Sequence, residues 1–278
     1  MPPPGAPSRI TSPANPRVKA LLRLRERRER EETGRFLVEE PLVIARARAA
    51  GWPLAEAWAC PERLDEAGRE IWEALRRDGV PAVEASEAVM DRLAYRDRSE
   101  GLLAVALRRP RQLVDLALPA GRPPLVVVLE DVEKPGNLGA VLRIADGVGA
   151  DAVLVAGGAD LDNPNVLRAS RGAFFTVPAV AAPRGQVVDW LRGRGLRLLA
   201  ADPGGADLWD ATELTGPVAI VLGAEHAGLS PALRAACDAT AGIPMRGSGD
   251  SLNVATAAAV LLYEAARRRR AQERAPAP

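Results

Sequence analysis

Near its C-terminus the chain reads Gly242-Ile243-Pro244-Met245-Arg246-Gly247-Ser248-Gly249-Asp250-Ser251-Leu252-Asn253-Val254. We expect a short apolar strand here, followed by a glycine-rich polar loop and the start of an alanine-rich helix. Ser251 and Asn253 stand where a helix needs capping, and Gly247 and Gly249 allow the backbone to pass close to a ligand. The stretch predicts a loop that holds a cofactor; a capped turn without a ligand is the alternative.

Length and composition limit the class of protein. The chain has 278 residues, enough for two ordinary domains, and 47% of them are apolar and 26% charged. No apolar run approaches the roughly 20 residues that a membrane span needs. The first residues lack the pattern of a secretory signal, and Cys60 and Cys237 lack metal-ligand spacing. We therefore expect a cytoplasmic protein without a bound metal.

The chain has a single histidine, which disfavours several kinds of chemistry. Zinc clusters and Cys–His pairs are not expected, because the chain has one histidine and its two cysteines are far apart in sequence. Ser–His–Asp hydrolysis would depend on His226 alone, and no nucleophile-elbow pattern occurs. A hydrolase of that kind is therefore disfavoured.

The N-terminal part reads as a small alternating α/β unit over residues 9–107. We expect a helix after Asn15, with further helices over 41–50 and 66–77. Short strands are expected over 35–38, 55–59, 80–83 and 101–107. Proline-rich residues 108–124 then indicate a linker.

The second unit is predicted over residues 125–270, with 271–278 as a disordered tail. It opens with the continuous apolar run 125–129, which is typical of a parallel strand buried on both faces. Further strands are expected over 152–156, 176–180, 196–201, 217–222 and 240–244. Helices are expected over 138–147, 166–172, 186–194, 230–237 and 254–270. This βαβ alternation predicts an open, mostly parallel sheet with helices on both faces and ligands beyond the carboxyl ends of its strands.

The loop after the first strand of this unit carries polar residues into a helix. Asn137 can cap that helix, and Arg143 lies almost two turns further on, among mostly apolar positions. An arginine there needs an anionic or hydrogen-bonding partner if it is partly buried, so a structural ion pair is one reading and a ligand contact the other. No G-x-G-x-x-G follows the strand, so this is not the dinucleotide fingerprint.

A third small-residue loop, from Gly223 to Gly228, follows the strand expected over 217–222. Ser230 and Pro231 supply an N-cap and a first-turn proline for the next helix. Because the three loops all follow strands predicted to be parallel, we expect them to gather on one edge and enclose one cavity.

Residues 9–35 contain nine basic and four acidic side chains. Such an excess is typical of a surface that contacts phosphates, although a solvated helix with i,i+4 ion pairs fits equally well. The candidates for RNA contact are Arg9, Arg17, Lys19, Arg23 and Arg27.

Together the three loops carry a family resemblance. In chain order they read Asn137-x-Gly139-x-x-x-Arg143, Gly223-x-Glu225-x-x-Gly228-Leu229-Ser230, and Ile243-Pro244-Met245-x-Gly247-x-x-x-Ser251-Leu252-Asn253-Val254. This set resembles the motifs of the SpoU (TrmH-like) RNA ribose 2′-O-methyltransferases of the SPOUT class, over roughly residues 125–270. Residues 9–107 resemble the smaller substrate-binding domain of that family, which has a ribosomal RNA-binding protein fold, although Glu40 stands where a glycine is expected.

The resemblance implies that S-adenosylmethionine is bound in a C-terminal trefoil knot, in a homodimer with the active site at the interface. It places Arg143, Asn137, Glu225, Ser251 and Asn253 at catalytic positions. It places at cofactor positions Leu222, Gly223, Ala224, Gly228, Ile243, Met245, Ser251 and Leu252. Ala224 stands where the family often has Ser or Asn, and His226 receives no role.

The implied reaction transfers a methyl group to a ribose 2′-OH of RNA, with 23S ribosomal RNA favoured as substrate. Arg143 would take the proton of the ribose 2′-OH, or would stabilise the alkoxide or an adjacent phosphate. The second role suits a guanidinium better, because arginine stays charged. The alternatives are a tRNA ribose methyltransferase, a non-catalytic RNA-binding protein of the same fold, and a nucleotide-binding enzyme such as an oxidoreductase. The missing glycine fingerprint disfavours the last of these.

Overall fold

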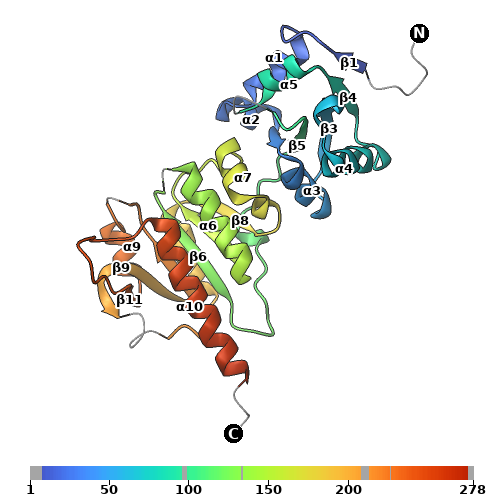
Figure 1. Cartoon of the computed structure of the whole chain (residues 1–278). Helices are drawn as coiled ribbons and strands as arrows, with labels where there is room; N and C mark the ends of the chain where they lie inside the picture. Colours follow the sequence, from blue (N-terminus) through green and yellow to red (C-terminus); the bar gives the residue numbers. More distant parts are fainter. Residues whose placement is uncertain (1–7, 96–98, 133, 208–212, 226, 275–278) are drawn as a thin grey trace. The chain divides into compact units, whose positions relative to one another are not determined.

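The computed structural model describes residues 8–95, 99–132, 134–207, 213–225 and 227–274 (Figure 1). His226 therefore lies outside the described residues. The chain forms two compact units. The first holds the residues up to Arg109 together with Asp162–Thr176, and the second holds Pro110–Leu161 together with the residues from Val177 onward.

The first unit is built on a mixed sheet with the strand order β1-β4-β3-β5-β2. Its strands are β1 (Ser8–Ile10), β2 (Arg35–Glu39), β3 (Leu54–Ala59), β4 (Ala82–Ala85) and β5 (Leu102–Leu107). β5 runs antiparallel to β2 and β3, and the remaining pairs are parallel. The helices are α1 (Pro16–Arg23), α2 (Arg27–Thr33), α3 (Pro41–Ala49), α4 (Glu66–Arg77), α5 (Glu87–Leu93) and α7 (Pro164–Ser170), with 3₁₀ turns at Pro61–Arg63 and Ala173–Phe175.

The segment Asp162–Thr176 belongs to this first unit, although it lies within the stretch 125–270 expected to form the second. The rings of Phe174 and Phe175 pack on Phe36 and Trp52 with centroid separations between 5.2 and 6.4 Å. Such aromatic clusters bury large apolar areas, so the segment completes a core that begins in β2.

A buried ion pair holds the same segment. Arg30 is 0% exposed, and its Nε donates to Asp162 Oδ1 at 3.2 Å. Arg30 Nη1 also donates to the carbonyls of Leu24 and Arg25, and Arg108 Nε donates to the second carboxylate oxygen of Asp162. Because a buried charge is tolerated only with such partners, Asp162 is required by the first unit.

The second unit is built on a sheet with the order β11-β9-β10-β6-β7-β8, in which all described pairs are parallel. Its strands are β6 (Leu125–Glu130), β7 (Ala152–Ala156), β8 (Ala179–Ala182), β9 (Arg197–Asp207), β10 (Val218–Leu222) and β11 (Ala239–Gly242). Its helices are α6 (Pro135–Val148), α8 (Arg184–Gly193), α9 (Pro231–Ala236) and α10 (Val254–Arg274), with a 3₁₀ turn at Leu113–Asp115.

Every residue of β6, β7 and β10 is buried, as expected for parallel strands covered on both faces. Val126 and Val128 of β6 share a core cluster with α8, and strand alternation turns Val127 to the other face. α6 and α10 pack against each other and lie in front of β6 in Figure 1. The α/β fold with a parallel sheet, predicted from the apolar runs, is confirmed.

Several boundaries differ from the expected ones. β8 begins at Ala179 instead of residue 176, because Ala173–Phe175 form a 3₁₀ turn that packs in the first unit. α10 continues to Arg274, four residues beyond the expected end of the last helix and into the expected tail. Strand β1 and helix α5 were not expected. Among the described residues, no helix is both long enough and apolar enough to span a membrane.

Asn137 does not cap α6, so that expectation was wrong. The N-cap is Lys134, and Pro135 occupies the first turn, which its fixed φ favours. Asn137 is therefore already inside the helix, and its side chain is available for another contact. The helix expected after Asn15 is confirmed, with Asn15 as its N-cap: Asn15 Oδ1 accepts from Arg17 N at 2.9 Å. The N-cap expected at Ser230 is also confirmed, since Ser230 Oγ accepts from Leu233 N at 3.2 Å.

Candidate functional site

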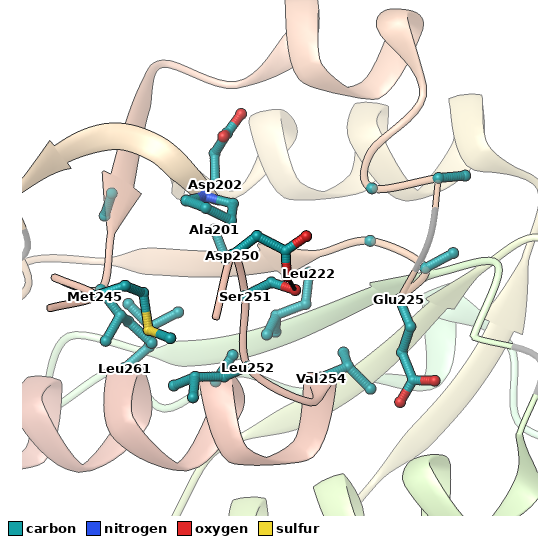
Figure 2. Close-up of a pocket in the computed structure, with 18 residues that line it drawn as sticks. Ala201, Asp202, Leu222, Glu225, Met245, Asp250, Ser251, Leu252, Val254 and Leu261 are labelled. Carbon is teal, nitrogen blue, oxygen red and sulfur yellow. Dashed lines mark hydrogen bonds between the residues drawn. The ribbon is translucent and has the colours of Figure 1, made fainter. Parts of the chain in front are cut away.

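A cavity of about 360 Å³ lies at the carboxyl ends of β10 and β11, beside the middle of β9 (Figure 2). The eight residues predicted to hold the cofactor all line it. Figure 2 shows Met245 and Leu261 at one end of the cavity and Glu225 at the other. Ligands in open parallel sheets collect at this edge, so two of the three predicted loops meet where the topology requires.

The loop after β10 closes on itself and needs glycine at its first position. Ala224 N donates to Gly228 O at 3.1 Å, and Gly228 N donates to Ala224 O at 2.9 Å. A Cβ on Gly223 would lie 2.2 Å from the carbonyl carbon of Gly228 and 2.4 Å from the nitrogen of Leu229. Gly228 itself has φ +65, a conformation that favours glycine. The shape of this cavity wall is therefore fixed by two glycines.

Polar side chains from all three loops meet at one edge of the cavity. Glu225 Oε1 accepts from Asn137 Nδ2 at 2.7 Å and from Asn253 Nδ2 at 2.5 Å. Asn253 Nδ2 also donates to Asn137 Oδ1 at 3.2 Å, and Lys134 Nζ donates to Glu225 Oε2. Asn137 thus contributes to the site without lining the cavity. The carboxylate of Glu225 connects the start of α6, the loop after β10 and the start of α10.

These donors act on the ionisation of Glu225. The hydrogen bond from Lys134, followed by those from Asn137 and Asn253, lowers the pKa of the Glu225 carboxyl. Each of them interacts more favourably with the charged form than with the neutral acid. At neutral pH Glu225 is therefore an ionised acceptor that fixes both asparagine amides and cannot donate a proton.

Asn253 also caps α10, because its Oδ1 accepts from Ala255 N at 3.0 Å. Ser251 does not cap that helix; its hydroxyl donates to Asp250 Oδ1 at 3.2 Å on the cavity wall. The sequence offered both residues as caps, and only Asn253 has that role. Ser251 is exposed toward the cavity and is free to meet a ligand.

Arg143 is not brought into this cluster. It lies on the exposed side of α6, does not line the cavity, and has no hydrogen-bond or ion-pair partner among the described residues. Because Arg143 is exposed, it does not need the anionic or hydrogen-bonding partner that a buried arginine would require. An exposed, unpaired guanidinium is available to a ligand or to another chain.

A buried carboxylate at the end of β6 holds the loop after β10 in position. Glu130, at the end of β6, is 1% exposed, and its Oε2 accepts from Ser230 N at 2.7 Å. Its Oε1 accepts from Ser230 Oγ at 2.7 Å and from Arg184 Nε. Glu130 therefore ties the end of the loop after β10 to the end of β6.

The sequence interpretation missed several residues of the site. Asp202 lines the cavity and pairs with Arg234, and Ala201 and Pro203 lie beside it. Ala201 ends the strand predicted over 196–201, and Asp202 and Pro203 follow directly on it, so the rule of carboxyl strand ends could have found them. Lys134 precedes the first motif and had no distinguishing pattern. Asp250, Val254, Ala257 and Leu261 complete the wall.

All four arginines proposed to contact RNA are paired with acidic side chains of the protein. Arg9 pairs with Glu62 at 2.7 Å and Arg17 with Glu56 at 2.5 Å. Arg23 pairs with Glu29 at 3.2 Å, and Arg27 with Glu31 at 2.8 Å. Lys19 is exposed. The alternative interpretation, a solvated surface with ion pairs, therefore describes much of residues 9–35.

The cavity suits S-adenosylmethionine. Its volume falls within the range of roughly 300–1,000 Å³ typical of small-ligand sites. Leu222, Ile243 and Leu252 provide apolar walls for an adenine ring, while Asp250 offers a carboxylate to hydroxyl or cationic groups. No group of three or more His, Cys, Asp or Glu side chains in the described part of the chain could hold a metal ion.

Comparison with known proteins agrees with the motifs. A family model described as the SpoU rRNA methylase family matches residues 124–263. The chain belongs to the SpoU rRNA methylase family. A second model, the MRM3-like substrate-binding domain, matches residues 15–104. The family predicted from the sequence is confirmed.

Among relatives in this SpoU family is a 23S rRNA (uridine(2479)-2′-O)-methyltransferase of Streptomyces viridochromogenes. It is 35% identical over 88% of this chain and 87% of its own length. A solved RNA 2′-O ribose methyltransferase is 44% identical with a TM-score of 0.84, covering 95% of this chain and 99% of that one. The SpoU methyltransferase AviRb of Streptomyces viridochromogenes, solved with AdoMet, is 34% identical with a TM-score of 0.81, covering 92% and 98%.

Proposed function

We propose that this protein transfers the methyl group of S-adenosylmethionine to a ribose 2′-OH of 23S rRNA. The observation that carries the proposal is the junction of Asn137, Glu225 and Asn253, one from each motif, at the edge of the cavity. Relatives of matching length that act on 23S rRNA and bind AdoMet support it.

The chain's own residues would chiefly bind and position the reactants. When bound, S-adenosylmethionine supplies an electrophilic methyl group on a sulfonium. Leu222, Ile243 and Leu252 would hold the adenosine between the two loops, and Glu225 would keep both asparagines in place beside the reacting ribose. Positioning of this kind accounts for a large part of many enzymatic accelerations.

Arg143 would stabilise the oxygen that loses its proton, or an adjacent phosphate. A guanidinium stays charged and can donate two parallel hydrogen bonds, so it suits an anionic oxygen better than it suits the role of a base. Because Arg143 is exposed and lies outside the cavity of its own chain, it would reach the reaction in a homodimer, beside the cavity of the second copy.

Transfer of tritiated methyl groups to 23S rRNA tests the activity, with calorimetry for the binding of S-adenosylmethionine. Arg143→Ala is expected to lower methyl transfer at least about 100-fold, while binding of S-adenosylmethionine stays within about twofold, because Arg143 does not line the cavity. Arg143→Lys should also be impaired, since the bidentate fork is lost. Arg270→Ala, at another exposed arginine of the second unit, is the matched control. Unchanged turnover of Arg143→Ala would refute the role.

The homodimer has its own test. In this scheme each site combines Arg143 of one copy with Asn253 of the other, so Arg143→Ala and Asn253→Ala are each inactive alone. A dimer of one chain of each variant would contain one site in which both residues are intact. About one quarter of the wild-type activity should return on mixing and re-equilibration. Sedimentation of the wild-type chain as a monomer at working concentration would contradict the scheme.

A further inference from the structure

Tyr95, at the end of α5 in the first unit, presents an exposed aromatic ring that is held in place. The residue is 41% exposed. Its backbone nitrogen donates to both carboxylate oxygens of Glu39 at 3.1 Å, and its hydroxyl accepts from Asn165 Nδ2 at 3.2 Å. A surface ring fixed at both ends loses little conformational entropy when a ligand packs on it.

Two guanidinium groups lie over this ring, within cation–π distance of its centroid. The Cζ of Arg25 lies 5.6 Å and that of Arg168 lies 6.0 Å from the ring centroid. Arg25 Nη2 donates to the carbonyl of Ala94 at 2.6 Å, and Arg168 Nη2 donates to Asn165 Oδ1 at 3.0 Å. Both cations are therefore held in position by uncharged groups of the protein.

These two arginines differ from those of the basic segment. Neither forms an ion pair within 4 Å with a carboxylate of the described residues, so their charge is not cancelled by a direct partner. Glu39 is the acidic group that faces them, and one carboxylate cannot cancel the charge of two guanidiniums. The group of Tyr95, Arg25 and Arg168, hereafter the Tyr95 cluster, therefore retains a positive charge.

An accessible aromatic ring beside fixed guanidiniums is the combination that binds single-stranded RNA. Unpaired bases stack on aromatic side chains, and arginines attract the flanking phosphates. We propose that the Tyr95 cluster is a stacking platform for an unpaired base of the RNA substrate. This inference builds on the proposed function, because it takes RNA as the substrate, and it locates a contact in the first unit that the basic segment does not include.

The test compares three proteins: wild type, Tyr95→Leu and Tyr95→Phe. Leucine keeps apolar volume but removes the π face, whereas phenylalanine keeps the ring and loses only the hydrogen bond from Asn165. The probe is 23S rRNA isolated from cells that lack this protein, with filter retention for binding and tritiated methyl transfer for activity. Calorimetry with S-adenosylmethionine and the melting temperature serve as folding controls.

Tyr95→Leu is expected to weaken RNA binding about 5- to 100-fold, the range seen when a stacking aromatic is removed. Its kcat/KM for RNA should fall equally, and the affinity for S-adenosylmethionine and the melting temperature should not change. Tyr95→Phe should stay within about threefold of wild type. RNA binding by Tyr95→Leu within twofold of wild type would overturn the proposal, as would equal losses in the leucine and phenylalanine variants.

Failure of the platform and failure of the proposed function give different results. If wild type methylates RNA and Tyr95→Leu does so equally well, the function stands and the platform is wrong. If wild type retains the RNA on the filter but transfers no methyl group, the proposed function fails, and the binding difference between the two variants still decides the platform. If wild type binds a fully paired RNA duplex as tightly as the 23S rRNA, the contact is to phosphates and the platform is wrong.

Discussion

Replacing Gly223 by alanine should disable cofactor binding although it removes no polar side chain. The added Cβ would lie 2.2 Å from the backbone of Gly228, where ordinary contacts begin near 3.4 Å. The loop must therefore move by about 1.2 Å, the difference between these two distances. That movement disrupts both backbone hydrogen bonds between Ala224 and Gly228, each worth about 1 kcal/mol.

The loss of two such bonds predicts a weakening of S-adenosylmethionine binding of at least about tenfold, since about 1.4 kcal/mol corresponds to a factor of ten. Calorimetry measures this affinity directly. Gly185→Ala in α8 is the matched control: its Cβ would meet nothing within 4 Å, so cofactor binding should not change. The reasoning is refuted if Gly223→Ala binds S-adenosylmethionine within twofold of wild type.

Three further predictions concern charge and burial. Glu130→Ala removes a buried carboxylate with several donors and should lower the free energy of unfolding by about 3 kcal/mol or more, measured by urea titration; a loss below about 1 kcal/mol would contradict this. Because the pKa of Glu225 is lowered in the folded protein, the hydrogen bonds to its carboxylate stabilise the site above pH 4.5 and are lost as the pH falls through the pKa of the folded state. Carbon-detected NMR should find a pKa of Glu225 below 4.5, and Lys134→Met should raise that pKa; an unchanged pKa in Lys134→Met would contradict this. Burial raises the pKa of Cys237 to about 11 and also raises that of Cys60, so neither thiol should react with iodoacetamide at pH 8 until guanidinium unfolds the protein; rapid labelling of the folded chain would argue against this.

The sequence was informative where its signals are local. The apolar runs of β6, β7 and β10 predict buried parallel strands because every residue must avoid water on both faces. The loops after β10 and β11 could be assigned to one cavity because parallel strands end at a common edge. The individual lining residues of these loops were implied by the family resemblance.

The remaining features depend on contacts between distant parts of the chain. Arg30 and Asp162 are 132 positions apart, and no local pattern indicates that they meet. The sequence predicts Asn137 as a helix cap, but the helix already begins at Pro135. The amide of Asn137 therefore donates to Glu225 instead. For the arginines near the N-terminus, the sequence fits an RNA surface and an ion-paired face equally well, because two of their acidic partners come from β3 and the turn after it.

The place of the Asp162–Thr176 segment affects how the protein is made. A ribosome releases the chain from the N-terminus, at roughly 5–20 residues per second, and domains generally fold as they emerge. The first unit, however, lacks α7, Phe174 and the carboxylate of Asp162 until residue 176 has been synthesised. Strands β6 and β7 emerge before that point, so the nascent chain must hold both units incomplete together. A fragment ending at Arg109 would expose Phe36 and leave Arg30 buried without its carboxylate, and it should aggregate where the whole chain folds.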